Sequence, residues 1–277
     1  MAKRIFKIVA IVLVAAIVAA ALLIAHSLLG SPISYALASA TAAKHLDDNY
    51  RDTDYVTDRI IYNFKDGSYY THIISPSSTD GSFSIRVSAL GELIGDDYEW
   101  RVTEHGNLTS RLDAEYRDLV DGLILSEEYP YRVSIGYGTL EFDKEEGEEP
   151  ARDALDRSEL VNDATYDVRS IGKTNGVLVL YIDTDSVSPE TASEILLRTR
   201  ELMDARGVGF YSVDLVLEHP PYDDEAPYDR PNGEIHLRGF LYADIYEDDL
   251  LARVGKCIED TRAYYDEQDE LKENEIG

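Results

Sequence analysis

The hydrophobic pattern begins with one long apolar stretch near the start of the chain. It runs from Ile8 to Ala25 without a charged or polar side chain, and Leu28 and Leu29 extend it. A helix rises about 1.5 Å per residue, so roughly 20 apolar residues cross a hydrocarbon core of about 30 Å. The pattern therefore predicts a transmembrane helix within residues 1–30. The anchor residues that we expect in the bilayer are Ile8, Leu13, Ile17, Leu22, Leu23 and Leu28.

Basic residues flank this stretch on one side only. Lys3, Arg4 and Lys7 precede it, and the next charge after it is Lys44. The positive-inside rule then predicts a single-pass protein of the cell membrane with a cytoplasmic N-terminus and extracytoplasmic domains. A cleaved signal peptide is the rival interpretation, because residues 36–38 (Ala-Leu-Ala) supply a small-residue cleavage site. We favour the retained anchor, because the apolar run exceeds the usual signal-peptide length of about 7–15 residues.

Residues 31–145 have the pattern of one α+β domain in the order α-β-β-β-β-α-β. Apolar residues recur at helical spacing over residues 35–50 and 108–123. Period-two alternation, typical of half-buried antiparallel strands, covers 56–64, 68–74, 83–87, 98–102 and 131–142. Asp66–Gly67 between two alternating runs is a strong hairpin signal. The expected fold is a helix packed on an antiparallel meander.

The charged run over residues 143–150 is the predicted boundary, and residues 146–277 form the second expected domain. Its order is β-β-α-β-β-α, and its βαββα part predicts a ferredoxin-like fold. Residues 177–182 are continuously apolar, as in a central strand. Ser188 and Pro189 are typical of a helix start, and Gly207 of its end. The last helix presents one stripe that includes Cys257, Ile258 and Tyr265. The whole chain is thus predicted to be an anchor followed by two α+β domains.

Charge limits the class of partner. The chain has 54 acidic and 26 basic residues and a formal net charge of −28. Such a protein repels nucleic acids and anionic head groups, so nucleic-acid binding is excluded. An envelope protein or a cationic component is the partner class that remains, besides the bilayer itself. The sole cysteine, Cys257, cannot form an intramolecular disulfide, so packing must stabilise the fold.

Candidate chemistry is sparse. The sequence lacks the G-x-S-x-G and S-x-x-K signatures of serine nucleophiles, and its six histidines lack zinc spacing. We therefore expect no catalytic residues, no cofactor and no enzyme activity. Asp183 and Asp185 follow a predicted buried strand, and Asp223 and Asp224 lie in a Pro-rich loop. These carboxylates are weak candidates for a cation site, although ordinary loop chemistry is favoured. A hydrolase that uses Asp183, Asp185 and a loop acid, or a cation-binding envelope protein, is the alternative.

Several motifs resemble those of membrane-anchored proteins of Gram-positive bacteria in the YfjL-like family. They are Ser31–Pro32, residues 62–67 (YNFKDG), residues 97–100 (DYEW), and Arg111–Leu112 through Tyr116. The resemblance covers residues 31 to about 140 best and the second half loosely. A fainter likeness is to PepSY-type or cystatin-like modules, which pair a helix with an antiparallel sheet and bind or inhibit. The resemblance carries over no functional residues. The predicted anchor, the two α+β domains and the lack of a catalytic constellation, rather than the resemblance, favour a membrane-tethered extracytoplasmic binding module that is not an enzyme.

Overall fold

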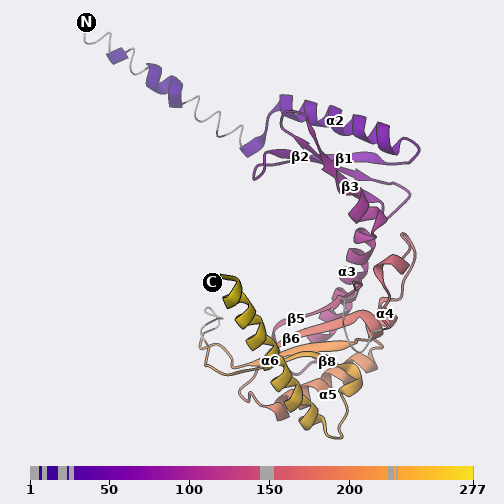
Figure 1. Cartoon of the computed structure of the whole chain (residues 1–277), viewed down its shortest axis with the longest axis vertical. Helices are drawn as coiled ribbons and strands as arrows, with labels where there is room; N and C mark the ends of the chain where they lie inside the picture. Colours follow the sequence, from indigo (N-terminus) through magenta and orange to yellow (C-terminus); the bar gives the residue numbers. More distant parts are fainter. Residues whose placement is uncertain are drawn as a thin grey trace. The chain divides into compact units, whose positions relative to one another are not determined.

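The chain folds into two compact units (Figure 1). The computed structural model describes residues 6–7, 11–17, 24, 28–143, 153–223, 228 and 230–276. The first unit comprises residues up to Leu108 together with Val161–Asp163. The second comprises Thr109–Leu160 and Ala164–Gly277. The division therefore falls at Leu108 rather than near residue 145, because the strand at 132–140 pairs with the strand at 176–183.

The predicted transmembrane helix requires correction. Across the part of the chain that the structure describes, no helix combines the length and apolar character needed to cross a membrane. The single-pass membrane localisation is therefore not supported. Of the expected anchor residues, Leu13, Ile17 and Leu28 are described, and each is helical. Ile8, Leu22 and Leu23 lie outside the described residues.

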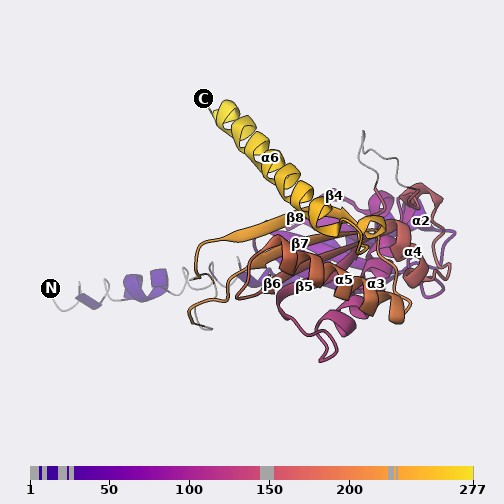
Figure 2. The same cartoon turned by 90° about the horizontal axis from the view of Figure 1, so that it is seen from below.

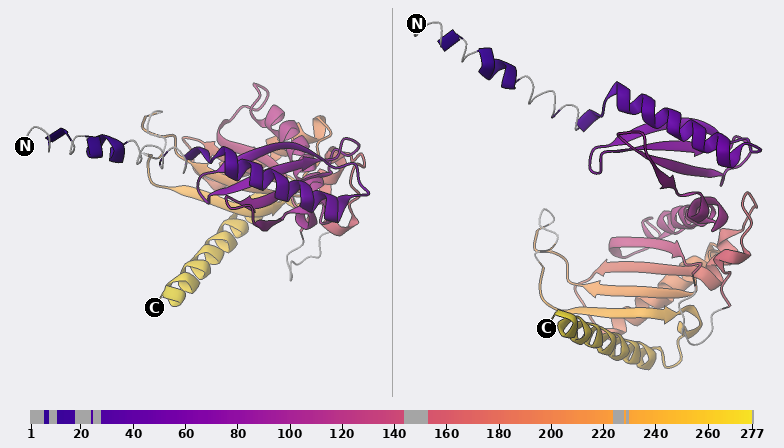
Figure 3. Two further views of the ribbon diagram at one scale, coloured as in Figure 1. Left: turned by 90° about the horizontal axis from the view of Figure 1, so that it is seen from above. Right: turned by 45° about the horizontal axis from the view of Figure 1, so that its top comes forward.

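The first unit is a helix on a four-stranded sheet. Helix α2 (Pro32–Tyr50) covers strands β1 (Val56–Asn63), β2 (Ser68–Ile74), β3 (Ser82–Ser88) and β4 (Leu93–Asp96), as Figure 3 shows. The strands follow one another in the sheet, and every pair is antiparallel. Ala38 and Ala42 let α2 approach closely, and Phe83 and Ile85 lie fully buried in the same core. This confirms the predicted helix and meander.

One predicted strand in this unit is wrong. Residues 98–102 alternate like a strand, yet Glu99–Thr103 forms a π-helical turn, and the fourth strand ends at Asp96. Two carboxylates turn the chain at that point. Asp96 accepts a hydrogen bond from the backbone N–H of Tyr98, and Asp97 accepts one from the N–H of Ser84. Such side-chain bonds compete with the strand ladder and stop it.

The second unit is a mixed sheet with helices. Its strands are β5 (Arg132–Leu140), β6 (Gly176–Asp183), β7 (Ser212–Glu218) and β8 (Glu234–Leu241), in that order across the sheet. Its helices are α3 (Gly106–Ile124), which begins at the junction, α4 (Val168–Asn175), α5 (Pro189–Ala205) and α6 (Leu250–Ile276). Ser188 caps α5 by accepting from the N–H of Thr191, as predicted. Residues 166–168, expected as a weak strand, instead lead into α4.

The ferredoxin-like prediction is not met. In that fold the two parallel strands joined by a helix are separated by another strand. Here β6 and β7 are direct neighbours, parallel, with α5 as their connection. The two central strands fully bury one face of this sheet, with Leu178, Leu180 and Leu215 inaccessible to solvent. The other face, which carries Val179 and Tyr181, is only partly buried.

Candidate functional site

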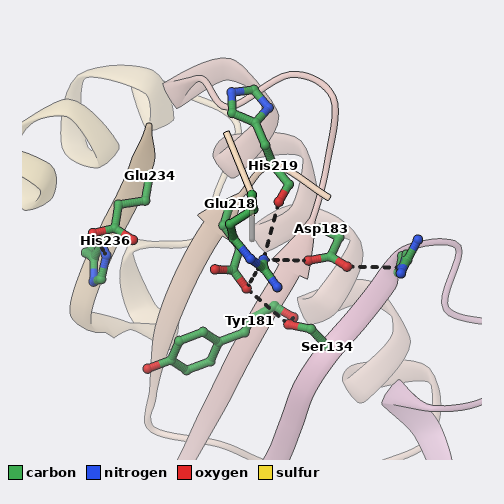
Figure 4. Close-up of polar contacts among 9 residues, drawn as sticks. Ser134, Tyr181, Asp183, Glu218, His219, Glu234 and His236 are labelled. Atoms are coloured by element: carbon green, nitrogen blue, oxygen red, sulfur yellow. Dashed lines mark hydrogen bonds and ion pairs between the residues drawn. The ribbon is translucent and has the colours of Figure 1, made fainter. Parts of the chain in front are cut away.

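The weak candidate Asp183 lies at the carboxyl end of β6, directly across from Glu218 at the end of β7. Parallel strands place these two carboxylates side by side. Arg230 bridges them, with Nη1 3.0 Å from Asp183 Oδ1 and 2.5 Å from Glu218 Oε1. Arg132 Nε lies 3.0 Å from the other Asp183 oxygen. Asp183, Glu218 and the carbonyl oxygen of His219 all contact the Arg230 guanidinium. Figure 4 labels these three residues and marks their contacts with dashed lines.

This network suits a structural role better than a chemical one. The Asp183 side chain is 3% exposed, and each of its oxygens faces a guanidinium. Both oxygens of this carboxylate are therefore engaged in ion pairs, which disfavours their use as metal ligands. Asp185 and Asp223 are exposed, and Asp224 lies outside the described residues. Within the described ranges no group of three or more His, Cys, Asp or Glu side chains is placed to hold a metal.

A second region, not expected from the sequence, lies where α6 meets β8. The Thr261 hydroxyl of α6 accepts a hydrogen bond of 3.1 Å from the backbone N–H of Arg238 in β8. Cys257 Sγ lies 3.7 Å from the carbonyl oxygen of Arg238. These side chains cover the outer edge of β8 at this point, which protects an edge strand from unwanted pairing. Beyond Thr261 the helix is almost entirely exposed and extends away from the sheet (Figure 2).

The divergence of the helix from the strand leaves a hollow of about 390 Å³, which we call the α6 cleft. Its lining residues are Glu234, His236, Ile258, Thr261, Arg262, Tyr265, Asp266 and Asp269. The rings of His236 and Tyr265 meet edge to face, with centroids 6.1 Å apart. His236 Nε2 lies 3.1 Å from Glu234 Oε1 without making a hydrogen bond to any described residue, and Figure 4 shows the two side chains together. The lining of the cleft thus combines the phenol ring of Tyr265, the imidazole of His236 and three carboxylates.

The opposite flank of α6 carries a second hollow of about 420 Å³, whose lining includes Arg238, Cys257 and Tyr264. The Arg238 guanidinium stacks over the Tyr264 ring at 4.2 Å from its centroid. Nearby, Asp214 accepts a hydrogen bond from the backbone N–H of Gly239. Burial raises the pKa of the Asp214 carboxyl and also that of the Cys257 thiol. A thiol with a raised pKa is a poor nucleophile.

Sequence reasoning found only part of this region. The helical stripe placed Ile258 and Tyr265 on one face of the last helix, and both do line the α6 cleft. Glu234 and His236 carried no signal, because nothing local in the sequence tells which strand the last helix packs against.

Comparisons with known proteins give two family-model matches. A model described as the YfjL-like N-terminal domain matches residues 5–98, and one described as the YfjL-like C-terminal domain matches residues 115–255. The interval between the matches contains the junction at Leu108. No curated protein and no solved structure matches the chain.

Proposed function

This chain belongs to the YfjL-like family, and on that premise we propose that it is a non-enzymatic binding module that holds a partner through its second unit. The two domain matches confirm the resemblance predicted from residues 31–140 and extend it to residue 255. Neither match bears on Gram-positive membrane anchoring or on the PepSY-type and cystatin-like likeness. The proposal therefore rests on the chemistry of the second unit.

The observation that supports it is the α6 cleft. Tyrosine and arginine are among the side chains most enriched at binding hot spots, because they offer large contact areas with a polar end. Tyr265 is 48% exposed at the cleft, and Tyr264, 37% exposed, carries the stacked Arg238 on the other flank. A concave surface with an aromatic anchor and a polar rim is what a partner side chain needs.

The alternative of a carboxylate hydrolase has less support. Its central residue would be Asp183, whose two oxygens already face Arg132 and Arg230 in a buried network. General acid–base catalysis needs a carboxyl group within reach of substrate. A side chain with 3% exposure, held by two guanidinium groups, does not offer one.

The test is a selection of random 12-residue peptides displayed on phage against the immobilised full chain. Enriched peptides should bind the wild type and lose more than about tenfold in affinity on Tyr265→Ala, since an aromatic hot spot contributes about 2 kcal/mol or more. Tyr35→Ala is the matched control, because Tyr35 is also on a helix and also 48% exposed, but belongs to the first unit. Peptides that do not distinguish the two variants, or no enrichment at all, would refute the proposal.

A further inference from the structure

The charge of the α6 cleft is unbalanced. Its lining contains three carboxylates, Glu234, Asp266 and Asp269, against the single guanidinium of Arg262, which leaves two negative charges among the lining residues when His236 is neutral. Lys272, outside the lining, lies 3.4 Å from Asp269 and offsets one of them, so the cleft stays negative. Asp266 and Asp269 are three residues apart on α6 and so lie on one face of the helix. Glu234 comes from β8, on the other side of the cleft. A positive group inside the cleft would therefore meet carboxylates from two elements.

The apolar part of the cleft selects the kind of cation. Ile258 and the Tyr265 ring line it, and Tyr265 leaves about half of its surface open. An aromatic face attracts a cation, and apolar side chains hold a methylene stem. A bare metal ion is a poor fit, because the described residues contain no group of three ligating side chains placed to hold one. A cation with an aliphatic stem matches both parts of the lining.

We propose that the α6 cleft binds the side chain of an arginine or lysine presented by a basic segment of a partner protein. Its stem lies along Ile258 and Tyr265, and its charged head lies between Glu234 and the two α6 aspartates. The net charge of −28 on the chain draws such a segment toward the surface over longer distances. The inference rests on the proposed function, because it assigns a ligand chemistry to the same cleft.

The probe is the peptide acetyl-Gly-Arg-Gly-amide, compared with the same peptide containing citrulline, which has nearly the shape of arginine but no charge. Both are titrated into the isotope-labelled full chain while NMR follows the resonances of Tyr265 and Glu234. The arginine peptide should shift these resonances and bind about tenfold or more tightly than the citrulline peptide. Added salt should weaken it, because exposed ion pairs are screened.

A pair of matched variants separates a local site from the overall field. Asp266→Asn with Asp269→Asn removes two carboxylates from the cleft, and should weaken the arginine peptide about tenfold. Glu267→Gln with Glu270→Gln removes the same charge at the same spacing on the same helix, but outside the lining, and should have little effect. All four side chains are exposed, so neither pair should disturb folding, which circular dichroism checks.

Each other outcome has a definite meaning. Equal weakening by the two variant pairs would attribute binding to the general field and overturn the cleft assignment. Equal binding of the arginine and citrulline peptides would overturn the cationic ligand while leaving the binding module intact. No shift at Tyr265 with either peptide would also overturn the cationic ligand, and the phage selection decides separately whether the cleft binds anything.

Discussion

Gly172 is the position where a single methyl group should do the most damage to the second unit. It lies in α4, against the backbone of Gly209 and the ring of Tyr116. A Cβ added there would lie well inside the contact distance of the Gly209 carbonyl oxygen and 2.7 Å from Tyr116 Cε2. The same carbonyl accepts the Tyr116 hydroxyl at 2.8 Å, and the Gly209 N–H donates to the Arg169 carbonyl at 3.0 Å. The backbone at Gly209 is therefore fixed from both sides.

The expected effect of Gly172→Ala is a balance of two opposite contributions. Alanine favours a helix over glycine by about 1 kcal/mol. Overpacking a tight contact costs about 1–3 kcal/mol, and loss of the Tyr116 hydrogen bond adds about 1 kcal/mol. The substitution should thus lower the free energy of unfolding by about 1–3 kcal/mol, although Gly→Ala at an exposed helix position without close neighbours is stabilising.

Gly255→Ala is the matched control, because Gly255 is also helical, in α6, and an added Cβ would meet nothing within 4 Å. It should raise the free energy of unfolding by up to about 1 kcal/mol. Urea unfolding of the full chain, followed by far-UV circular dichroism, measures both. Fluorescence of the sole tryptophan, Trp100, reports separately on the first unit. A Gly172→Ala variant as stable as the wild type would refute the packing argument.

Two further predictions concern partly buried titratable groups in the second unit. Burial raises the pKa of the Cys257 thiol, so alkylation by iodoacetamide at pH 8, followed by mass spectrometry, should be much slower in the folded chain than in urea; equal rates would contradict this. Burial also raises the pKa of Asp214 above its unfolded value, so the ionised carboxylate destabilises the fold at neutral pH, and this penalty fades as the pH falls through the folded pKa. Asp214→Asn keeps an acceptor for the Gly239 N–H and should raise the urea midpoint more at pH 7 than at pH 4; a gain independent of pH would count against the argument.

Features with a local cause could be predicted from the sequence. The start of α5 is set by the Ser188 hydroxyl, which accepts from an N–H three residues away, and by Pro189. The turn between β1 and β2 uses Gly67 at φ +67° and the Asp66 carboxylate, which accepts from the Ser68 N–H. These interactions involve residues that are close in sequence, so residue type and spacing determine them.

Features set by distant partners could not be predicted. The pairing of β5 with β6 joins segments about 40 residues apart, and it moves the division between the units to Leu108. The order of β6 and β7 likewise depends on the packing of α5, which periodicity does not specify. The apolar run at residues 8–25 met the length rule for a membrane helix, but among the residues that the structure describes no helix meets it.

The α6 cleft shows the same limit within one helix. Periodicity placed Tyr265 on the stripe that faces inward, and the stripe does face β8 as far as Thr261, which is 4% exposed. Tyr265, one turn later, is 48% exposed. An apolar stripe shows which residues share a face of the helix. It does not show how far along the helix the sheet follows, because other segments of the chain form the sheet. Beyond Thr261 the helix diverges from β8, and the cleft lies between them.

Two clusters of carboxylates in the second unit, the Asp183–Glu218 pair and the carboxylates of the α6 cleft, differ in how their charge is compensated. Asp183 and Glu218 are largely shielded from solvent, where an unpaired charge would be very unfavourable, and Arg132 and Arg230 supply equal positive charge. Glu234, Asp266 and Asp269 are exposed at the α6 cleft, and Arg262 is the only guanidinium among its lining residues. Water tolerates that excess at little cost until a partner displaces it. The Asp183–Glu218 pair is thus compensated by cations of the chain itself, whereas the cleft carboxylates outnumber the cations beside them, Arg262 and the Lys272 that pairs with Asp269. This excess is what a cationic side chain of a partner would reduce.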